Sequence, residues 1–198
     1  MWRIGLTGSI ATGKSTVLEA FADLGVPVFS ADQAVAELYA GDAVAPVETL
    51  FPGVTRNGAV DRTLLSQQLA ADPSGFRRLE AVVHPLVRAR IARFMDEAEK
   101  AGEVLAVVEV PLLFESGYDY GFDAIAVTWV DEDIQHQRAL ARPGMSVEKL
   151  ATMLARQMPQ ADKKTRATYL FDTGMPIAKT VDMVTALVAA IRAKGPEH

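Results

Sequence analysis

The stretch Gly8-Ser9-Ile10-Ala11-Thr12-Gly13-Lys14-Ser15 decides the fold, because it matches G-x-x-x-x-G-K-[ST], the phosphate-binding loop or P-loop. Its glycines let the backbone wrap tightly, so that successive N–H groups point at phosphate oxygens. A helix that starts near Gly13 adds its positive N-terminal end, Lys14 reaches the β- and γ-phosphates, and Ser15 offers a hydroxyl to Mg²⁺. The pattern arises by chance in roughly one chain in a hundred of this length. It predicts nucleoside triphosphate binding by Gly8, Ala11, Thr12, Gly13, Lys14, Ser15 and Thr16.

The sequence on either side of the loop has the strand-to-helix context that the motif requires. Trp2–Thr7 reads as a buried strand, and apolar residues repeat at helical spacing from Val17 to Leu24. Gly25 ends this helix, and a second short strand is expected at Val26–Phe29. A strand, a helix and a strand in under thirty residues form a βαβ unit, so the strands should be parallel.

Three further strands complete the predicted sheet. Leu105–Val110 and Ala124–Val130 are continuous apolar runs, as expected of parallel strands buried on both faces, and Tyr169–Phe171 is a weaker candidate. An apolar stripe from Ile177 to Ile191 predicts a closing helix. We therefore expect an α/β fold of the P-loop NTPase type, with three α/β/α layers around a five-stranded parallel sheet.

Two segments interrupt the alternation of strands and helices. Residues 33–102 look mostly helical, with one helix carrying Pro85 in its first turn, and form a candidate substrate-binding insertion. Residues 133–166 are polar and basic, which is typical of either a solvated helical surface or a mobile cationic lid over phosphates. The predicted single domain thus has a core at about 1–32, 103–132 and 167–198, a helical part at about 33–102, and a lid at about 133–166.

Composition excludes several classes of function. The chain has 198 residues, a net charge of −5 and a pI near 5.2, so its overall charge supports binding neither to nucleic acid nor to a membrane surface. The absence of cysteine excludes disulfides, thiolate metal sites and cysteine nucleophiles. The three histidines lie far apart, which argues against a histidine-rich metal site. With no secretory signal and no apolar run of spanning length, we expect a cytoplasmic protein.

The chain lacks the guanine-reading N/T-K-x-D motif that a GTPase needs. Two acidic residues favour a kinase instead. Asp32 follows the second strand, and ligands of a doubly wound sheet gather at the carboxyl ends of its strands. It would orient an acceptor hydroxyl and take its proton, or it would merely cap the next helix. Glu109 ends an apolar strand as a Walker B carboxylate does, which makes it a candidate for holding Mg²⁺ with Ser15. Glu115 and Asp119 lie in a loop, where acids are usually solvated.

The ordered set of motifs resembles the dephospho-coenzyme A kinase family over nearly the whole chain. The P-loop alone indicates only a nucleoside triphosphate, whereas the set is specific. It comprises Ile4-Gly5-Leu6-Thr7-Gly8, Gly25-Val26-Pro27-Val28, Ala31-Asp32, Gly58-Ala59-Val60-Asp61-Arg62, Leu79-Glu80-Ala81-Val82-Val83-His84-Pro85, Val110-Pro111-Leu112-Leu113-Phe114-Glu115, Gln137-Arg138, Arg142, Gly144-Met145-Ser146 and Arg156-Gln157-Met158.

This resemblance implies ATP-dependent phosphorylation of the 3′-hydroxyl of dephospho-coenzyme A, the last step of coenzyme A synthesis. It implies a parallel-sheet core, a helical coenzyme-binding part and a lid. By analogy, Asp32 is the catalytic base, Lys14 a phosphate ligand, and Arg142 with Arg138 a pair of lid cations that stabilise charge on the transferred group. The candidate acceptor contacts are Thr7, Asp32, His84, Pro111 and Leu112.

The sequence departs from the family pattern in places. Ser30-Ala31-Asp32 stands where Asp-Ala-Asp is usual, and Ala36 where an Arg is frequent. The late Asp-Asn-x-Gly pattern reads Asp172-Thr173-Gly174, which leaves the adenine contacts open. Another P-loop nucleoside or nucleotide kinase, or an ATP-binding module without transfer chemistry, remains an alternative. His84, which precedes Pro85, would be a structural residue if it has no acceptor role.

Overall fold

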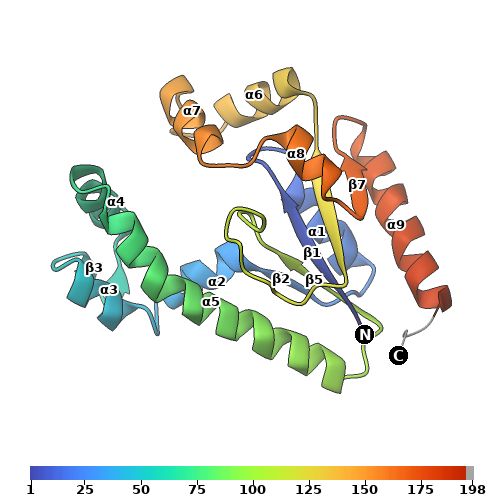
Figure 1. Ribbon diagram of the computed structural model, residues 1–198, viewed down its shortest axis with the longest axis horizontal. Coiled ribbons are helices and arrows are strands. Elements are labelled where there is room, and N and C mark those ends of the chain that lie inside the picture. The colour runs from blue at the N-terminus through green and yellow to red at the C-terminus, as the bar shows by residue number, and fades with distance from the viewer. Residues whose placement is uncertain (195–198) are drawn as a thin grey trace. The chain divides into compact units, whose positions relative to one another are not determined.

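The computed structural model describes residues 1–194 and is built around one parallel sheet (Figure 1). Its strands run in the order β2-β5-β1-β6-β7. β1 pairs in parallel with β5 and β6, and β6 with β7. The predicted α/β class and five-stranded sheet are confirmed. The strands are β1 (Trp2–Gly8), β2 (Val28–Ser30), β5 (Leu105–Glu109), β6 (Ala124–Trp129) and β7 (Tyr169–Asp172).

The chain divides into two compact units. The first comprises Met1–Phe29 and the chain from Met95 onward, and the second comprises Ser30–Phe94. The first unit contains the P-loop and the segment predicted to form a lid. The second contains most of the stretch predicted as the helical insertion. Residues 195–198, the end of the predicted core and the position of His198, lie outside the described residues.

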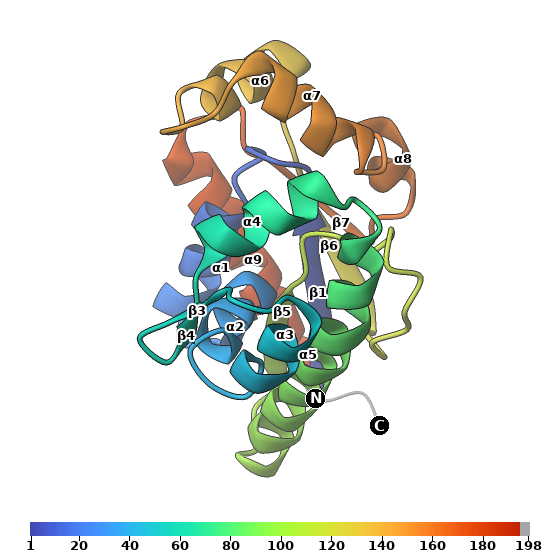
Figure 2. The ribbon, with the colours of Figure 1, turned by 90° about the vertical axis from the view of Figure 1, so that its left-hand side faces the viewer.

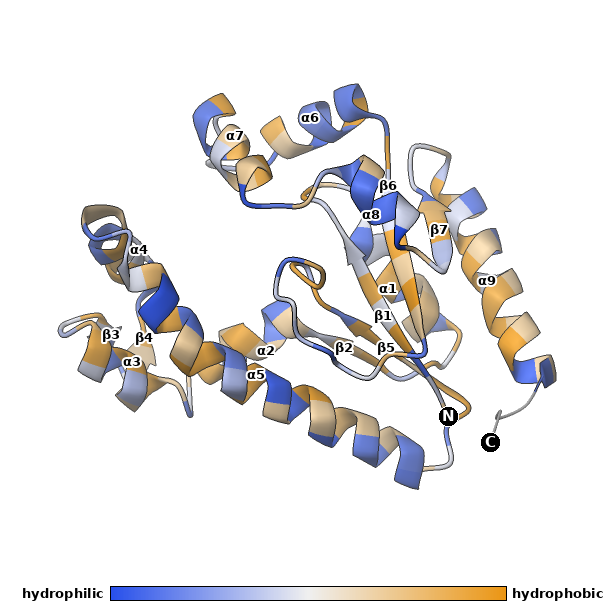
Figure 3. Cartoon of the chain, in the orientation of Figure 1, coloured by the Kyte–Doolittle hydropathy of each residue, from blue (hydrophilic) through white to orange (hydrophobic). Residues whose placement is uncertain are grey.

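In the first unit, the P-loop follows β1 directly and α1 (Lys14–Asp23) follows the loop. Three short helices stand beyond the carboxyl ends of β1 and β6, as Figures 1 and 2 both show. Figure 3 shows both polar and apolar residues on these helices, and a few apolar residues of the segment pack against the P-loop residues Ile10 and Ala11. The three helices are α6 (Glu132–Leu140), α7 (Val147–Ala155) and α8 (Gln160–Thr165).

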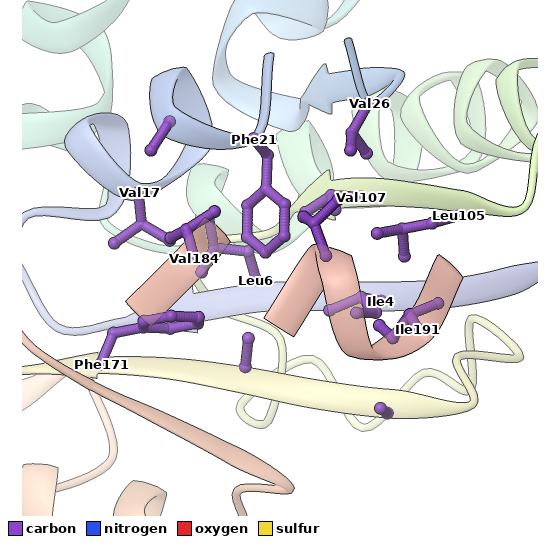
Figure 4. Packing of buried hydrophobic residues seen from close by; sticks show 14 residues of the cluster. Ile4, Leu6, Val17, Phe21, Val26, Leu105, Val107, Phe171, Val184 and Ile191 are labelled. Atoms are coloured by element: carbon purple, nitrogen blue, oxygen red, sulfur yellow. The ribbon is translucent and has the colours of Figure 1, made fainter. Parts of the chain in front are cut away.

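The core of the first unit lies on the face of the sheet that α1 and α9 (Ile177–Lys194) cover. Phe21 of α1 is fully buried and meets Phe171 of β7 edge to face, with ring centroids 6.2 Å apart. Figure 4 shows the Phe21 ring directed toward the side chains of the central strands. The apolar alternation of β1 and the helical stripe of α9 therefore form one packed layer, which fixes the end of β1 from which the P-loop emerges.

The second unit is mainly helical. A two-stranded antiparallel hairpin closes through Asn57 and Gly58, whose φ angles of 51° and 79° are those that an Asn-Gly turn favours. Arg90 and Glu37 form an ion pair of 2.8 Å between two helices of this unit. The elements are α2 (Ala31–Leu38), α3 (Val44–Leu50), β3 (Thr55–Arg56), β4 (Ala59–Val60), α4 (Arg62–Ala71) and the N-terminal part of α5 (Gly75–Lys100).

The position of Pro85 corrects one prediction. Instead of opening a helix, Pro85 lies inside the 26-residue helix α5, which begins ten residues earlier at Gly75. A proline removes one backbone hydrogen bond from a helix. Buried residues on both sides of Pro85, including Val83 and Val87, continue the apolar stripe through it. Packing of that stripe therefore outweighs the local preference for a helix start at proline.

None of the helices within residues 1–194 combines the length and the apolar content that crossing a membrane requires.

Candidate active site

The P-loop is a nest of backbone groups that turns sharply between β1 and α1. Ala11 has a φ of 61° and Gly13, the N-cap of α1, a φ of 80°. A side chain on Gly13 would also bring its Cβ within about 3.0 Å of the Thr173 side chain. No side chain caps the N-terminus of α1, and its first turn contains no acid. The loop and the helix terminus therefore present backbone N–H groups and a positive dipole, which together bind phosphate well.

Lys14 supplies the side-chain cation of this loop. Its Nζ donates to the carbonyl oxygens of Gly8 and Ser9, at 3.0 and 3.1 Å, so the ammonium group lies across the loop. Ser15 is exposed in the first turn of α1, and Thr16 beside it is half-buried. The roles of Lys14 as a phosphate-binding ammonium and of Ser15 as a hydroxyl for Mg²⁺ stay predictions.

Two glutamines hold the peptide groups of Ile10 in the P-loop. Gln157 accepts a hydrogen bond at Oε1 from Ile10 N (2.9 Å), and Gln135 donates from Nε2 to Ile10 O (2.8 Å). Gln160 donates to Gln135 Oε1 and accepts from Val130 N. Gln157 belongs to a motif quoted above, but neither it nor Gln135 was assigned a role. The sequence offers little indication of these two contacts with Ile10, because they join residues more than a hundred positions apart.

A threonine network supports the other side of the loop. The buried Thr12 hydroxyl lies 2.8 Å from that of Thr128 and donates to Ser9 O. Thr173 Oγ1 donates to Thr12 O at 2.9 Å. Thr173 thus stands where the family pattern has Asn and contacts the P-loop backbone directly. This contact, too, was not predicted.

Arg138 and Arg142 differ in their surroundings. Arg138 on α6 donates through Nη1 to Thr173 Oγ1 (3.3 Å) and through Nη2 to Thr173 O (2.8 Å), so its guanidinium group is fixed next to the P-loop. Arg142 follows α6 and is exposed, with its backbone N–H bonded to Ala139 O. Arg138 is therefore anchored at the loop, while Arg142 presents a solvated cation from the segment that was predicted to form a lid.

The candidate residues at the ends of β1 and β5 lie close together. Thr7 donates through Oγ1 to Pro111 O at 3.2 Å, and Val110 N bonds to Leu6 O. Glu109 ends β5 beside Leu6 in the sheet register and is 8% exposed. Leu112, which follows Pro111, is 40% exposed. The structure thus brings Thr7, Glu109 and Pro111 together at the edge of the sheet where the P-loop begins.

Asp32 lies in the second unit, in the first turn of α2. Ser30 is the N-cap of that helix and accepts from Gln33 N, so Asp32 is not needed as the cap. Asp32 is exposed and lines a cavity of about 430 Å³ together with Tyr39 and Arg62. The Arg62 guanidinium lies 5.5 Å from the centre of the Tyr39 ring. Burial raises the pKa of the Tyr39 hydroxyl, while the charge of Arg62 opposes that rise, so Tyr39 is a neutral donor near pH 7.

His84 lines a different cavity of the second unit, of about 220 Å³, with Arg77, Glu80 and Arg88. It is exposed in the interior of α5, where it caps no helix start. Because Asp32 and His84 line separate cavities, the structure does not gather these two candidate acceptor contacts into one cavity.

A metal ion at the P-loop would have few protein ligands. Within residues 1–194 no three His, Asp or Glu side chains come together as a metal-binding group. The candidates are the exposed Ser15 hydroxyl and the Glu109 carboxylate at the end of the strand next to β1. Few oxygen donors from the protein fit Mg²⁺, which usually retains waters and takes further ligands from substrate phosphates. The residues present therefore fit a Mg²⁺ ion that arrives with a nucleotide.

Comparison with known proteins agrees with this arrangement. The dephospho-CoA kinase family model matches residues 2–178. A dephospho-CoA kinase of Rhodopseudomonas palustris is 47% identical over 195 residues, 98% of each chain. A crystal structure from Thermus thermophilus superposes with a TM-score of 0.81 at 31% identity over 96% of each chain. The dephospho-CoA kinase of Campylobacter jejuni, at 22% identity and a TM-score of 0.72, shares the fold over 97% of this chain and 98% of its own. This chain belongs to the dephospho-CoA kinase family.

Proposed function

We propose that this chain transfers the γ-phosphoryl group of ATP to the 3′-hydroxyl of the ribose of dephospho-coenzyme A. The products are coenzyme A and ADP, and the reaction is the last step of coenzyme A biosynthesis. The observation that carries the proposal is the P-loop with Lys14 across it, in a chain that belongs to this family over residues 2–178. Membership of the family does not favour the alternative of a general nucleoside or nucleotide kinase.

At the phosphate end, the backbone N–H groups from Ala11 to Thr16 hold the β- and γ-phosphates, and Lys14 exchanges its carbonyl partners for phosphate oxygens. A loose phosphoryl transfer involves little covalent chemistry, so positioning and neutralisation of charge dominate. Arg138, anchored by Thr173, contributes a fixed positive charge beside the loop. Arg142 contributes a solvated one that meets charge developing on the transferred group.

At the acceptor end, the cavity with Asp32 receives part of dephospho-coenzyme A. Its volume of about 430 Å³ suits a portion of such a ligand, and Tyr39 and Arg62 add a donor and a cation for its polar groups. Asp32 is not the N-cap of α2, because Ser30 has that role. Asp32 orients the 3′-hydroxyl and accepts its proton as the oxygen attacks the γ-phosphorus. Thr7, His84, Pro111 and Leu112 are further candidate contacts to the acceptor.

Mg²⁺ accompanies ATP in this proposal. The Ser15 hydroxyl and the Glu109 carboxylate, acting through water, are the protein groups that would hold it. When bound, the ion neutralises phosphate charge. A cytoplasmic location remains a prediction from the sequence.

The test of this function is ADP release with Mg-ATP and a panel of acceptors: dephospho-coenzyme A, adenosine, AMP, CMP and none. We expect turnover only when dephospho-coenzyme A is the acceptor. Turnover with a nucleoside or nucleotide, but not with dephospho-coenzyme A, would replace this substrate within the kinase class. ATP binding without transfer to any acceptor would favour a binding module.

A further inference from the structure

Glu115 is not a solvated loop acid, as its place in a loop suggested. Its side chain is 16% exposed and forms an ion pair of 2.8 Å with Lys163, whose side chain is completely buried on α8. Its Oε1 also accepts from Met158 N at 2.7 Å. Burial works to raise the pKa of this carboxyl, but the contacts with Lys163 and Met158 outweigh it and hold the pKa below its ordinary value. Glu115 is therefore an ionised, largely buried anchor at neutral pH.

Two routes lead from this anchor to the same residue of the P-loop. Along the first, Met158 is held by Glu115, and the preceding residue, Gln157, accepts from Ile10 N at 2.9 Å. Adjacent residues share a rigid peptide plane, so a shift of Met158 moves the Gln157 backbone with it. The Glu115 carboxylate thus determines where the acceptor for Ile10 N lies.

The second route passes through the helix that carries Lys163. Gln160 lies one turn before Lys163 on α8 and donates to Gln135 Oε1 at 2.8 Å. Gln135 in turn donates to Ile10 O at 2.8 Å. Both hydrogen bonds that glutamine side chains make to Ile10 therefore depend on groups that Glu115 holds in place.

From this geometry we propose that Glu115 is a positioning residue of the P-loop. Through Met158–Gln157 and through Lys163–Gln160–Gln135, it fixes the peptide groups on both sides of Ile10. Ile10 directly precedes Ala11, whose φ of 61° begins the turn of the N–H groups toward phosphate. Loss of this support spreads the orientations of those N–H groups and weakens binding of the ATP phosphates. The inference rests on the proposed function only in taking ATP as the ligand of the loop.

A pair of double variants separates positioning from stability. Glu115→Gln/Lys163→Met removes both charges but keeps an oxygen that accepts from Met158 N. Glu115→Leu/Lys163→Met is equally neutral and lacks that acceptor. Both variants lose the contact with Lys163 equally, so they are compared with each other. The dissociation constant of Mg-ATP, measured by calorimetry well below the melting temperature of each variant, should be about fivefold higher for the second than for the first, as expected for the loss of one buried hydrogen bond. Equal constants for the two variants would overturn the proposal.

Gln157→Ala keeps the proposal testable if the double variants do not fold. It removes the acceptor for Ile10 N without leaving a buried charge, and it should also raise the ATP dissociation constant about fivefold. Gln67→Ala, at an exposed position of α4, is the matched control and should leave the constant unchanged. Unchanged ATP binding in Gln157→Ala would contradict the first route. Because the readout is ATP binding, failure of the wild type to phosphorylate dephospho-coenzyme A would refute the proposed function without deciding this inference.

Discussion

Replacement of Lys163 by methionine is the sharpest test of the buried ion pair. The ammonium is 0% exposed and 2.8 Å from Glu115 Oε1, whose side chain is 16% exposed. The substitution leaves the carboxylate largely buried, with Met158 N as its remaining partner from the α7–α8 connection. Removal of one partner of a buried pair costs about 3–5 kcal/mol, a large part of the 5–15 kcal/mol that stabilises a typical domain. For a chain of this size the melting temperature should fall by about 6–20 °C.

Differential scanning calorimetry at pH 7.5 measures this loss, with Lys149→Met as the control. Lys149 is exposed and its ammonium donates to Gly144 O at 2.8 Å, so its loss should cost below about 1 kcal/mol. The double variant Glu115→Gln/Lys163→Met should recover most of the stability, because it leaves no unpaired charge. A melting temperature of Lys163→Met within 2 °C of the control, roughly the effect of 1 kcal/mol, would refute this account of the pair.

The pH dependence gives a second check on the same variant. The folded-state pKa of Glu115 lies below its unfolded value. Its contribution to wild-type stability is therefore fully present above the unfolded pKa, and it is lost as the pH falls through the folded one. In Lys163→Met, protonation of the Glu115 carboxyl removes the unpaired buried charge and so stabilises the folded variant. The difference in melting temperature between variant and wild type should therefore narrow as the pH falls from 7 toward 4. A difference in melting temperature that does not depend on pH would mean that Lys163→Met loses stability through altered packing and not through an unpaired charge.

Three substitutions in and around the P-loop follow from its geometry. Lys14→Ala should weaken ATP binding, measured by calorimetry, and lower turnover, measured by ADP release, because the ammonium contacts phosphate both in bound ATP and in the transition state. Unchanged ATP binding would contradict the assignment of Lys14 as a phosphate ligand. Arg142→Ala should lower kcat about 10²–10³-fold with an ATP dissociation constant near that of the wild type, whereas a lost affinity with normal kcat would make it a ground-state ligand. Gly13→Ala should weaken ATP binding at least tenfold, because its φ is 80° and a Cβ would meet Thr173 at 3.0 Å; wild-type affinity would show that the loop tolerates this strain.

The sequence predicted the sheet and the loop because their signals are local. The P-loop motif, the buried runs of β5 and β6 and the stripe of α9 are each read from consecutive residues. The ends of β5 and β6 moved by one residue, and α9 extends three residues past Ile191. Prediction failed at Pro85 because burial of a continuous apolar stripe outweighed a local preference. Local rules carry no information about such a competition between packing and propensity.

The supports of the P-loop could not be predicted for a related reason. Gln135, Gln157 and Thr173 touch the loop only through contacts over more than a hundred residues of sequence. Glu115 was interpreted as a solvated acid because its buried partner, Lys163, lies 48 positions later in a segment rich in surface cations. The assignments of Asp32, Arg142 and His84 to catalysis or acceptor binding stay predictions.

The position of the phosphate on the product tests the central claim most directly. Dephospho-coenzyme A is incubated with Mg-ATP and the enzyme, and the product is examined by mass spectrometry and phosphorus NMR. Our account predicts one added phosphate, present as a monoester coupled to the ribose 3′ position, with one ADP formed per product. Phosphate released to water, or attached elsewhere on the acceptor, would contradict it.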